Sequence, residues 1–348
     1  MIHDSLNERE KLILRSIVQQ FILTASPVGS RNITKRFDIG VSPATVRNIM
    51  SDLEDSGFIN HPHTSAGRVP TDKGYRYYVD SLMEIQMISS SEKRIIDRTL
   101  ETKNNEPDEI LKIASRLLSS ITKQIACVTY PTLDHGILTK IQLVSLSSTR
   151  LLVVVSIQSG LVKTITLEFE TEINQEKLSN VESLINERLN GLTFQEIRDT
   201  AKDRLNDFAG EEKPIMRLFV DSVDKIFKDV KKDEKILITG ATNIIQQPEF
   251  DEPGKFQGVI ELIEDKDIII HIMDKKKSDY DNNILITIGS ENEDEKLNEF
   301  SLITKEYSFG ETSGTVGIIG PKRMEYSKVV AIVSYLGAML TEVLTGNK

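Results

Sequence analysis

Residues 28–68 read VGSRNITKRFDIGVSPATVRNIMSDLEDSGFINHPHTSAGR. Ser30 is placed to cap a first helix, which should end where Gly40 can adopt a positive φ. Ser42, followed by a proline, is placed to cap a second helix, and Gly57 is placed to end it. The stretch therefore predicts two short helices joined by a tight turn.

The second helix should present two different faces. One face carries apolar residues at the spacing of a buried helical stripe: Val46, Ile49, Met50 and Leu53. The start of the helix and its other face carry the residues that we expect to contact DNA: Ser42, Ala44, Thr45, Arg47, Asn48 and Ser51. A recognition helix offers its N-terminal residues to the major groove, where arginine pairs with guanine, asparagine with adenine and alanine with the thymine methyl group. An ordinary solvated helix surface would carry similar residues, so this helix alone does not decide the function.

A hairpin is expected after the second helix. Short strands at 58–59 and 68–69 flank a polar segment that contains proline and glycine. A wing beside a recognition helix is suited to contacts with phosphates or the minor groove. The hairpin residues expected to make these contacts are His61, His63, Thr64, Ser65 and Arg68. Two histidines around one proline supply at most two metal ligands, whereas zinc requires three or four, so we expect no metal site.

These motifs carry a family resemblance. The run SPATVRNIMSDLEDSGFI, from Ser42 to Ile59, and the run HTSAGRVPTDKGYRYYVD, from His63 to Asp80, resemble the signature of the HrcA heat-inducible transcription repressors. The resemblance extends more weakly over the rest of the chain. It implies repression of chaperone operons through an inverted-repeat operator on double-stranded DNA, the CIRCE element. It also implies a homodimer, loss of repression on heat shock and assistance by a chaperonin.

Charge is distributed unevenly along the 348 residues. Residues 1–85 contain ten basic and ten acidic residues, so the remainder carries the whole net charge of −10. An acidic chain is not a general nucleic-acid binder. A local excess of cations, Arg31, Lys35, Arg36 and Arg47 against Asp38, instead favours specific binding of a duplex.

Other composition features point to a cytoplasmic protein. The N-terminus is acidic and polar, unlike a signal peptide, and we expect no apolar run of the roughly 18 residues that span a membrane. Cys127 is the only cysteine and is expected to be a buried structural thiol in a strand.

The apolar patterns beyond residue 88 predict an α+β multidomain protein. We expect a winged helix-turn-helix head at 1–88, a linker helix at 89–107, and a sheet domain at 108–191 and 283–348 interrupted by an inserted α/β subdomain at 192–282. Antiparallel strands at 125–130, 138–146, 151–157, 161–168, 284–288, 302–309 and 315–319 should form one sheet with one covered face. Inside the insertion, strands are expected at 236–239 and 268–273. The family resemblance supplies two further names, GAF-like for the sheet domain and dimerising for the insertion.

Several helix starts and one pair of contacts are predicted as well. Asn7 with Glu10 and Thr193 with Glu196 have the spacing of capping boxes, and Thr71 is placed to cap another helix. In the helix that Thr71 begins, Arg76 and Tyr77 are expected to pack against the wing in preference to contacting a phosphate.

Catalysis finds little support in the sequence. There is no Walker A lysine, no HExxH and no Gly-x-Ser-x-Gly, and His135 lies in a loop without a paired nucleophile. We therefore expect neither an enzyme nor a cofactor. Two alternatives remain open: a small-molecule-responsive repressor with a ligand pocket in the GAF-like sheet, and a scaffold whose winged domain binds protein.

Three apolar runs predict where heat should act: 151–157, 268–273 and 284–288. They lack proline and Lys, Arg, Asp or Glu, so partial unfolding would expose segments that aggregate as β-structure. A sheet assembled across a long insertion also folds slowly. We therefore expect heat to inactivate the body before the head, with a chaperonin maintaining the active form.

Overall fold

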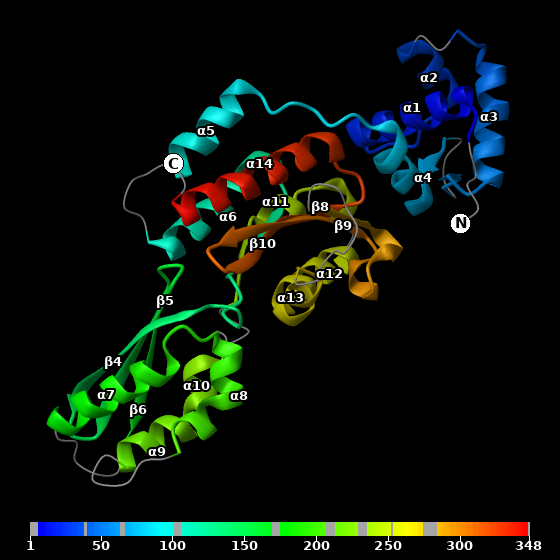
Figure 1. The fold of residues 1–348 in the computed structure, drawn as a ribbon. Coiled ribbons are helices and arrows are strands. Elements are labelled where there is room, and N and C mark those ends of the chain that lie inside the picture. The colour runs from blue at the N-terminus through cyan, green and yellow to red at the C-terminus, as the bar shows by residue number, and fades with distance from the viewer. Residues whose placement is uncertain are drawn as a thin grey trace.

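The computed structural model describes residues 6–37, 40–62, 67–100, 106–168, 175–206, 213–228, 235–251, 253–273 and 284–346. Its N-terminal part, here called the head, contains helices α1 (Glu8–Thr24), α2 (Ser30–Arg36) and α3 (Pro43–Asp55), the hairpin β1 (Ile59–Asn60) and β2 (Val69–Pro70), and α4 (Asp72–Tyr77), which continues as a π-helical turn η1 (Tyr78–Leu82). The head lies at one end of the molecule (Figure 1).

The predicted helix starts are largely confirmed. Asn7 and Glu10 form the capping box of α1, and the Ser42 hydroxyl accepts a hydrogen bond from the Thr45 N–H at 3.2 Å. The first helix-turn-helix element differs, because Gly29 is the N-cap of α2 and Ser30 makes no capping hydrogen bond. The turn between α2 and α3 requires glycine, since Gly40 has a φ of +66°.

A five-stranded antiparallel sheet forms the centre of the body. Its strand order is β7-β3-β10-β9-β8. The bounds are β3 (Ile125–Thr129), β7 (Ile236–Thr239), β8 (Ile284–Ile288), β9 (Phe300–Phe309) and β10 (Thr312–Pro321). Helices α5 (Ser90–Leu100), α6 (Pro107–Thr122) and α14 (Tyr326–Thr345) lie on one side (Figure 1). The chain between β7 and β9 also forms α11 (Ala241–Ile245), α12 (Pro253–Glu264), α13 (Lys266–Met273) and short 3-10 turns at Pro248–Phe250, Gly289–Glu291 and Glu295–Leu297.

Both faces of this sheet are covered, so the prediction of one covered face was wrong. Ala126 and Val128 belong to the cluster under α6 and α14, whereas Ile125 and Cys127 belong to the cluster under α11–α13. All five residues of β3 are buried. A continuous apolar run such as β3 is typical of a strand covered on both faces, in contrast to the alternation of a half-exposed strand.

The single predicted sheet is in fact two sheets. Strands β4 (Leu138–Ser147), β5 (Arg150–Ile157) and β6 (Val162–Glu168) form their own antiparallel sheet. With α7 (Gln175–Leu189), α8 (Phe194–Arg204), α9 (Lys213–Asp221) and α10 (Val223–Phe227) they enclose a separate apolar core. We call residues 138–228 the lobe. The chain leaves the central sheet after β3 and returns at β7, so the predicted boundary at 192 divides the lobe and places β7 in the wrong unit.

The predicted strand at 268–273 is a helix, α13. Ile269, Ile270, Ile272 and Met273 are buried in the cluster beneath the central sheet. A short apolar run fits a buried strand and a buried helix equally well, because periodicity cannot distinguish them when every face is covered.

Helix α14 corrects the expectation that no apolar run reaches membrane length. Among the described residues it is the one helix long and apolar enough to span a membrane by those criteria alone. It packs on β9 and β10, and 56% of its most apolar window is buried inside the protein. Its apolar face is therefore accounted for by the central sheet.

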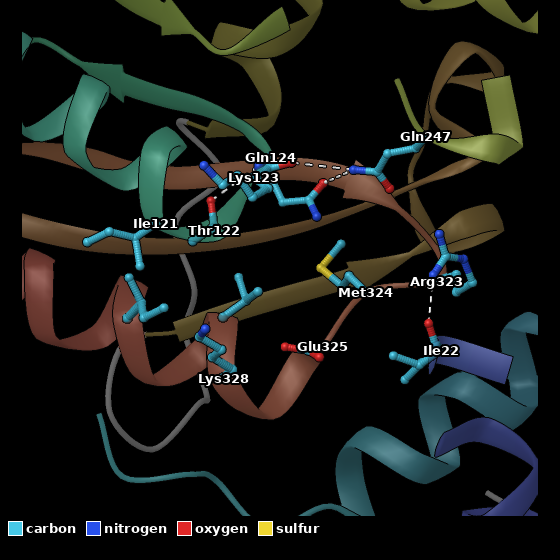
Figure 2. A pocket seen from close by; sticks show the side chains of 12 residues that line it. Ile22, Ile121, Thr122, Lys123, Gln124, Gln247, Arg323, Met324, Glu325 and Lys328 are labelled. Atoms are coloured by element: carbon cyan, nitrogen blue, oxygen red, sulfur yellow. Dashed lines mark hydrogen bonds between the residues drawn. The ribbon is translucent and has the colours of Figure 1, made fainter. Parts of the chain in front are cut away.

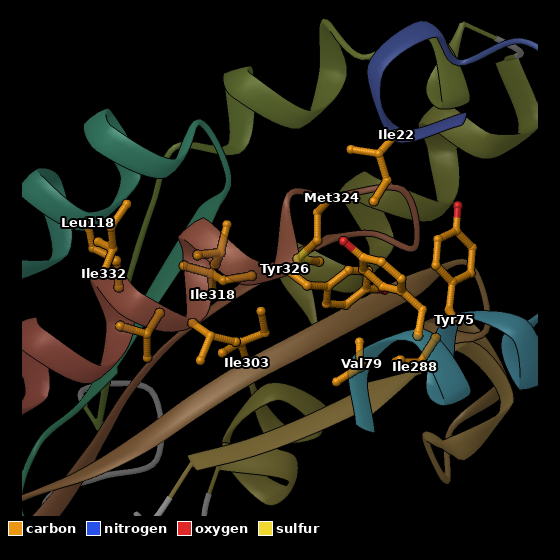
Figure 3. Close-up of a cluster of buried hydrophobic side chains, with 14 of the residues drawn as sticks. Ile22, Tyr75, Val79, Leu118, Ile288, Ile303, Ile318, Met324, Tyr326 and Ile332 are labelled. Atoms are coloured by element: carbon orange, nitrogen blue, oxygen red, sulfur yellow. The ribbon is translucent and has the colours of Figure 1, made fainter. Parts of the chain in front are cut away.

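One apolar cluster runs without interruption from the head into the body. It joins Ile22 and Val79 of the head to Ile303, Ile318 and α14 (Figure 3). At the junction the rings of Tyr75 and Tyr326 lie with centroids 6.0 Å apart. The head is thus packed against the body, and the two do not have separate cores.

The approach of α4 to the hairpin depends on Gly74. A Cβ at this position would lie 2.1 Å from the Phe58 carbonyl oxygen. We expect Gly74→Ala to destabilise the protein by about 1–3 kcal/mol, since the helix must move away from β1. Thermal unfolding followed by circular dichroism measures this. The control is Gly258→Ala in α12, where an added Cβ meets no atom within 4 Å and alanine favours the helix by about 1 kcal/mol. Equal unfolding temperatures for the two variants would contradict this account.

Candidate nucleic-acid interface

Helix α3 is amphipathic in the way the sequence predicted. Val46, Met50 and Leu53 are buried in the head, and Ile49 is half-buried. The opposite side is exposed and carries Ala44, Arg47, Asn48 and Ser51. Ser42 and Thr45 lie at the start of the helix, where their hydroxyl oxygens are 3.0 Å apart. The first turns of α3 therefore offer a polar surface to a ligand outside the protein.

Four cations accompany that surface. Arg31, Lys35 and Arg36 of α2 and Arg47 of α3 are exposed, and none of their side chains makes a hydrogen bond or ion pair with a described residue. Cations without internal partners keep their full charge for an external anion, and duplex DNA presents a dense row of phosphates. The three cations of α2 were recognised in the sequence as a charge excess but were not assigned a role.

The base of the hairpin is tied to α3 through Arg68. Its Nε and Nη2 atoms contact Glu54 of α3 at 2.7 and 2.6 Å, and Nη1 contacts His61 Nδ1. Its backbone pairs with Val28 in both directions. The guanidinium is therefore engaged inside the head, which makes Arg68 a support for the hairpin. His61 is exposed, whereas His63, Thr64 and Ser65 lie outside the described residues.

Helix α4 supports the hairpin from the other side. Thr71 caps the helix and also donates to the Gly57 carbonyl at 2.7 Å. The ring of Tyr77 packs edge-on against Phe58 at 5.3 Å, and Lys73 lies over the same ring at 4.4 Å. The prediction that Tyr77 packs near the wing is thus confirmed.

Arg76 does not contact the wing, contrary to the prediction. It donates to Glu291 at 2.7 Å, to the Ile286 carbonyl at 2.7 Å and to Asp80 at 3.1 Å. Burial alone would lower the pKa of Arg76, but hydrogen bonds and charge from Glu291 raise it above its usual range. Glu291 follows β8 in the body, so Arg76 joins the head to the central sheet. Partners 215 residues apart cannot be recognised from local sequence.

Asp72 makes a second polar contact with the body. It accepts a hydrogen bond from the Ser290 N–H at 2.9 Å and pairs with Lys322 at 3.1 Å. Burial alone would raise the pKa of Asp72, but these two donors hold it below its usual range. Gly289 permits the approach, because a Cβ there would lie 2.2 Å from an Asp72 carboxylate oxygen.

Arg323 makes the third contact between head and body. Its Nη1 donates to the Ile22 carbonyl at the end of α1 at 2.6 Å, while the rest of the guanidinium pairs with Glu249. We refer to the contacts of Arg76, Asp72 and Arg323 together as the head–body contacts. They fix the direction in which α3 points relative to the body.

The described residues hold no group of three or more His, Cys, Asp or Glu side chains suited to a metal ion. Cys127 is buried, and burial raises the pKa of its thiol to about 12. It therefore stays protonated at neutral pH, in agreement with the predicted structural role.

Comparisons with known proteins identify relatives over the whole chain. Residues 108–330 match the family model described as the HrcA protein C terminal domain. The heat-inducible transcription repressor HrcA of Chlorobium phaeobacteroides strain BS1 is 42% identical over 355 residues, covering 99% of this chain and 100% of that protein. The protein of the same name from Chlorobaculum tepidum is also 42% identical, with complete coverage of both chains. A crystal structure described as that of a hypothetical protein has a similar fold, with a TM-score of 0.61, 24% identity and coverage of 99% of this chain and 100% of that one.

The strength of the Arg76–Glu291 contact can be measured by a double-mutant cycle. The two side chains are only 25% and 33% exposed, so we expect Arg76→Ala and Glu291→Ala to show a coupling free energy of about 1–3 kcal/mol in denaturant unfolding. The control is the exposed pair Arg150–Glu168, at 58% and 75% exposure, where coupling should be at most about 1 kcal/mol. Equal coupling free energies in both pairs would show that the Arg76–Glu291 pair stabilises the protein no more than an exposed ion pair does.

Proposed function

The chain belongs to the HrcA family of heat-inducible transcription repressors, and from this and the geometry of the head we propose that α3 reads the major groove of an inverted-repeat (CIRCE) operator. In this proposal the head is a winged helix-turn-helix domain of a cytoplasmic protein. The observation that carries it is the exposed start of α3, where the side chains of Arg47 and Asn48 have no partner among the described residues and lie beside the cations of α2. Arginine and asparagine are the residues that pair most specifically with guanine and adenine.

The contacts divide into two kinds in this proposal. Arg47, Asn48 and Ala44 face the base edges, with Ser51 and the helix start nearby. Arg31, Lys35 and Arg36 of α2, with the hairpin tip, face the phosphates, which position the protein without reading sequence. Arg68 holds the hairpin on α3 through Glu54, so its effect on DNA binding is indirect.

Replacing Arg47 tests the base contacts. Arg47→Ala should weaken operator binding by about 1–3 kcal/mol and relax the base preference at one base pair. Lys35→Ala should weaken binding to all sequences. It should also reduce the slope of log affinity against log salt concentration by about 1, because one phosphate contact is lost. Gel-shift titration of operator variants at several salt concentrations measures both effects. Arg116→Ala, an exposed arginine of α6, is the control. Unchanged affinity and specificity in Arg47→Ala would mean that α3 is not the reading helix.

We further propose that the active protein is a two-fold dimer. One short helix reads only a few base pairs, and an inverted repeat requires two heads related by a two-fold axis. The predicted insertion at 192–282 divides the apolar core of the lobe, so the lobe takes the dimerising role in this proposal. One face of its sheet carries Val144 and Val162, which are 44% and 60% exposed. Leu152 and Val154 continue that face, as the strand register requires.

Charged residues on that face should separate the dimer. We expect the double variant Val144→Glu, Val162→Glu to sediment as a monomer and to bind the inverted repeat no better than a half-site, since two carboxylates cannot be buried in an apolar interface. The control is Ile260→Glu on α12, which is 36% exposed and lies outside the lobe. A double variant that remains dimeric would place the interface elsewhere.

Thermal control is proposed to act on the body, with a chaperonin as the partner that rescues it. Strand β5 contains one of the three apolar runs expected to aggregate when exposed, and β8 coincides with another. β3 must pair with β10, which follows it by nearly 190 residues, and such distant pairing is slow to form. Loss of the central sheet would also release the head–body contacts, so α3 would lose its defined position.

Hydrogen exchange on the full chain tests this order of events. With rising temperature, amides of β5 and β8 should lose protection before those of α1 and α3, together with loss of operator binding and a rise in light scattering. Added chaperonin with ATP should restore operator binding. Earlier loss of protection in α3 would contradict a body-first mechanism.

A further inference from the structure

A cavity of about 240 Å³ lies where the head meets the body (Figure 2). Its walls come from the end of α1, the end of α6 and the segment that leads from β10 into α14. Apolar side chains cover part of it: Ile22, Ile121, Met324, Val329 and Ile332. The polar part includes Lys123, Gln124 and Gln247. The cavity is separate from the DNA-facing surface of α3 and from the lobe.

Gln124 supplies a donor that faces this cavity. Its side-chain oxygen accepts a hydrogen bond from Gln247 Nε2 at 3.2 Å. The orientation of Gln247 is defined because the same nitrogen donates to the Lys123 carbonyl at 3.4 Å, and a carbonyl can only accept. Gln124 Nε2 is therefore turned toward Met324 and the cavity (Figure 2). It has no acceptor among the described residues, although Gln124 is only 7% exposed.

The position of Gln124 is tightly constrained. A Cβ at Gly320 would lie 2.5 Å from its side-chain oxygen, so the glycine leaves just enough room for the amide. Ser119 Oγ also donates to the Gln124 backbone carbonyl at 2.9 Å. A donor without a protein acceptor is satisfied by water or by a ligand, and the locked amide offers this donor to the cavity. The amide is thus prepared for an acceptor inside the cavity.

The charges around the cavity favour a single negative charge. The Lys123 ammonium has no partner among the described residues, and the N-terminus of the 20-residue helix α14 adds a partial positive charge. Lys328 and Arg323 are already paired with Glu92 and Glu249. Glu325, without a partner among the described residues, also lines the cavity and disfavours a dianion.

We propose that this cavity binds a small organic carboxylate, with its anionic group on Gln124 Nε2 and Lys123 and its hydrocarbon part on the apolar wall. A water molecule occupies about 30 Å³ in the liquid, so the volume suits a molecule of about the size of benzoate. Because Ile22 belongs to the head and its carbonyl is held by Arg323, the bound carboxylate contacts both head and body. Occupancy of the cavity therefore changes operator affinity. This effect on DNA binding rests on the proposed function, whereas the binding of the carboxylate itself does not.

Binding is tested on the full-length protein with benzoate, its neutral isostere benzamide, and acetate. Isothermal titration should show saturable benzoate binding, with benzamide and acetate each weaker by about tenfold, because one lacks the charge and the other the hydrocarbon. Lys123→Gln and Gln124→Glu should both weaken benzoate binding by about tenfold. Lys123 is exposed, so that variant keeps the fold intact. Lys140→Gln, the same charge change on exposed Lys140 of β4, should bind benzoate normally.

Three results of the titration would overturn the site. They are no saturation by benzoate up to tens of millimolar, equal binding of benzamide, or unaltered binding by both cavity variants. None of these measurements uses DNA, so they stand whatever the outcome for the operator.

The coupling is tested separately by operator titration with and without saturating benzoate. Operator affinity should shift by the same factor by which operator shifts benzoate affinity, as thermodynamic reciprocity requires. Lys123→Gln should bind operator normally and lose the benzoate effect. An operator affinity that is identical with and without bound benzoate would overturn the coupling.

Discussion

The ion pair between Arg76 and Glu291 is the contact on which the placement of the head depends. A partly buried guanidinium is tolerated only when its donors are matched. Here Glu291 and the Ile286 carbonyl of the body and Asp80 of the head accept its hydrogen bonds. The apolar contact of Tyr75 with Tyr326 buries surface between head and body, but apolar burial does not by itself fix their relative orientation. The charged contacts therefore orient α3, while the shared apolar cluster holds head and body together.

The central sheet lies between the head, which is proposed to read DNA, and the lobe, which is proposed to dimerise (Figure 1). Its order places β8 at one edge, next to the head–body contacts, and β7 with β3 at the other, where the chain leaves for the lobe. Burial of both faces, by α6 with α14 and by α11–α13, makes the sheet a rigid connection between the lobe and the head (Figure 1). A dimer formed through the lobes would thus set the distance between two α3 helices through the sheet.

The distribution of charge explains how an acidic protein can bind DNA selectively. The net charge of −10 resides outside residues 1–85 and disfavours random association with phosphates. The exposed sides of α2 and α3 gather four cations whose side chains have no partner among the described residues. Affinity then depends on a fit at this one surface, which suits a repressor that must ignore most of the genome.

The sequence by itself determined the elements whose signals are local. Capping at Asn7, Ser42, Thr71 and Thr193, the amphipathic pattern of α3 and the burial of Cys127 follow from neighbouring residues, and the family signature lies in one continuous stretch. Only the tertiary structure decided which strands share a sheet, that the run around Ile270 is helical, and that Arg76 belongs to the body contact and Arg68 to the hairpin support. These outcomes depend on partners distant in the chain. Hydrophobic periodicity indicates that a residue is buried, but it does not identify the residues against which it packs.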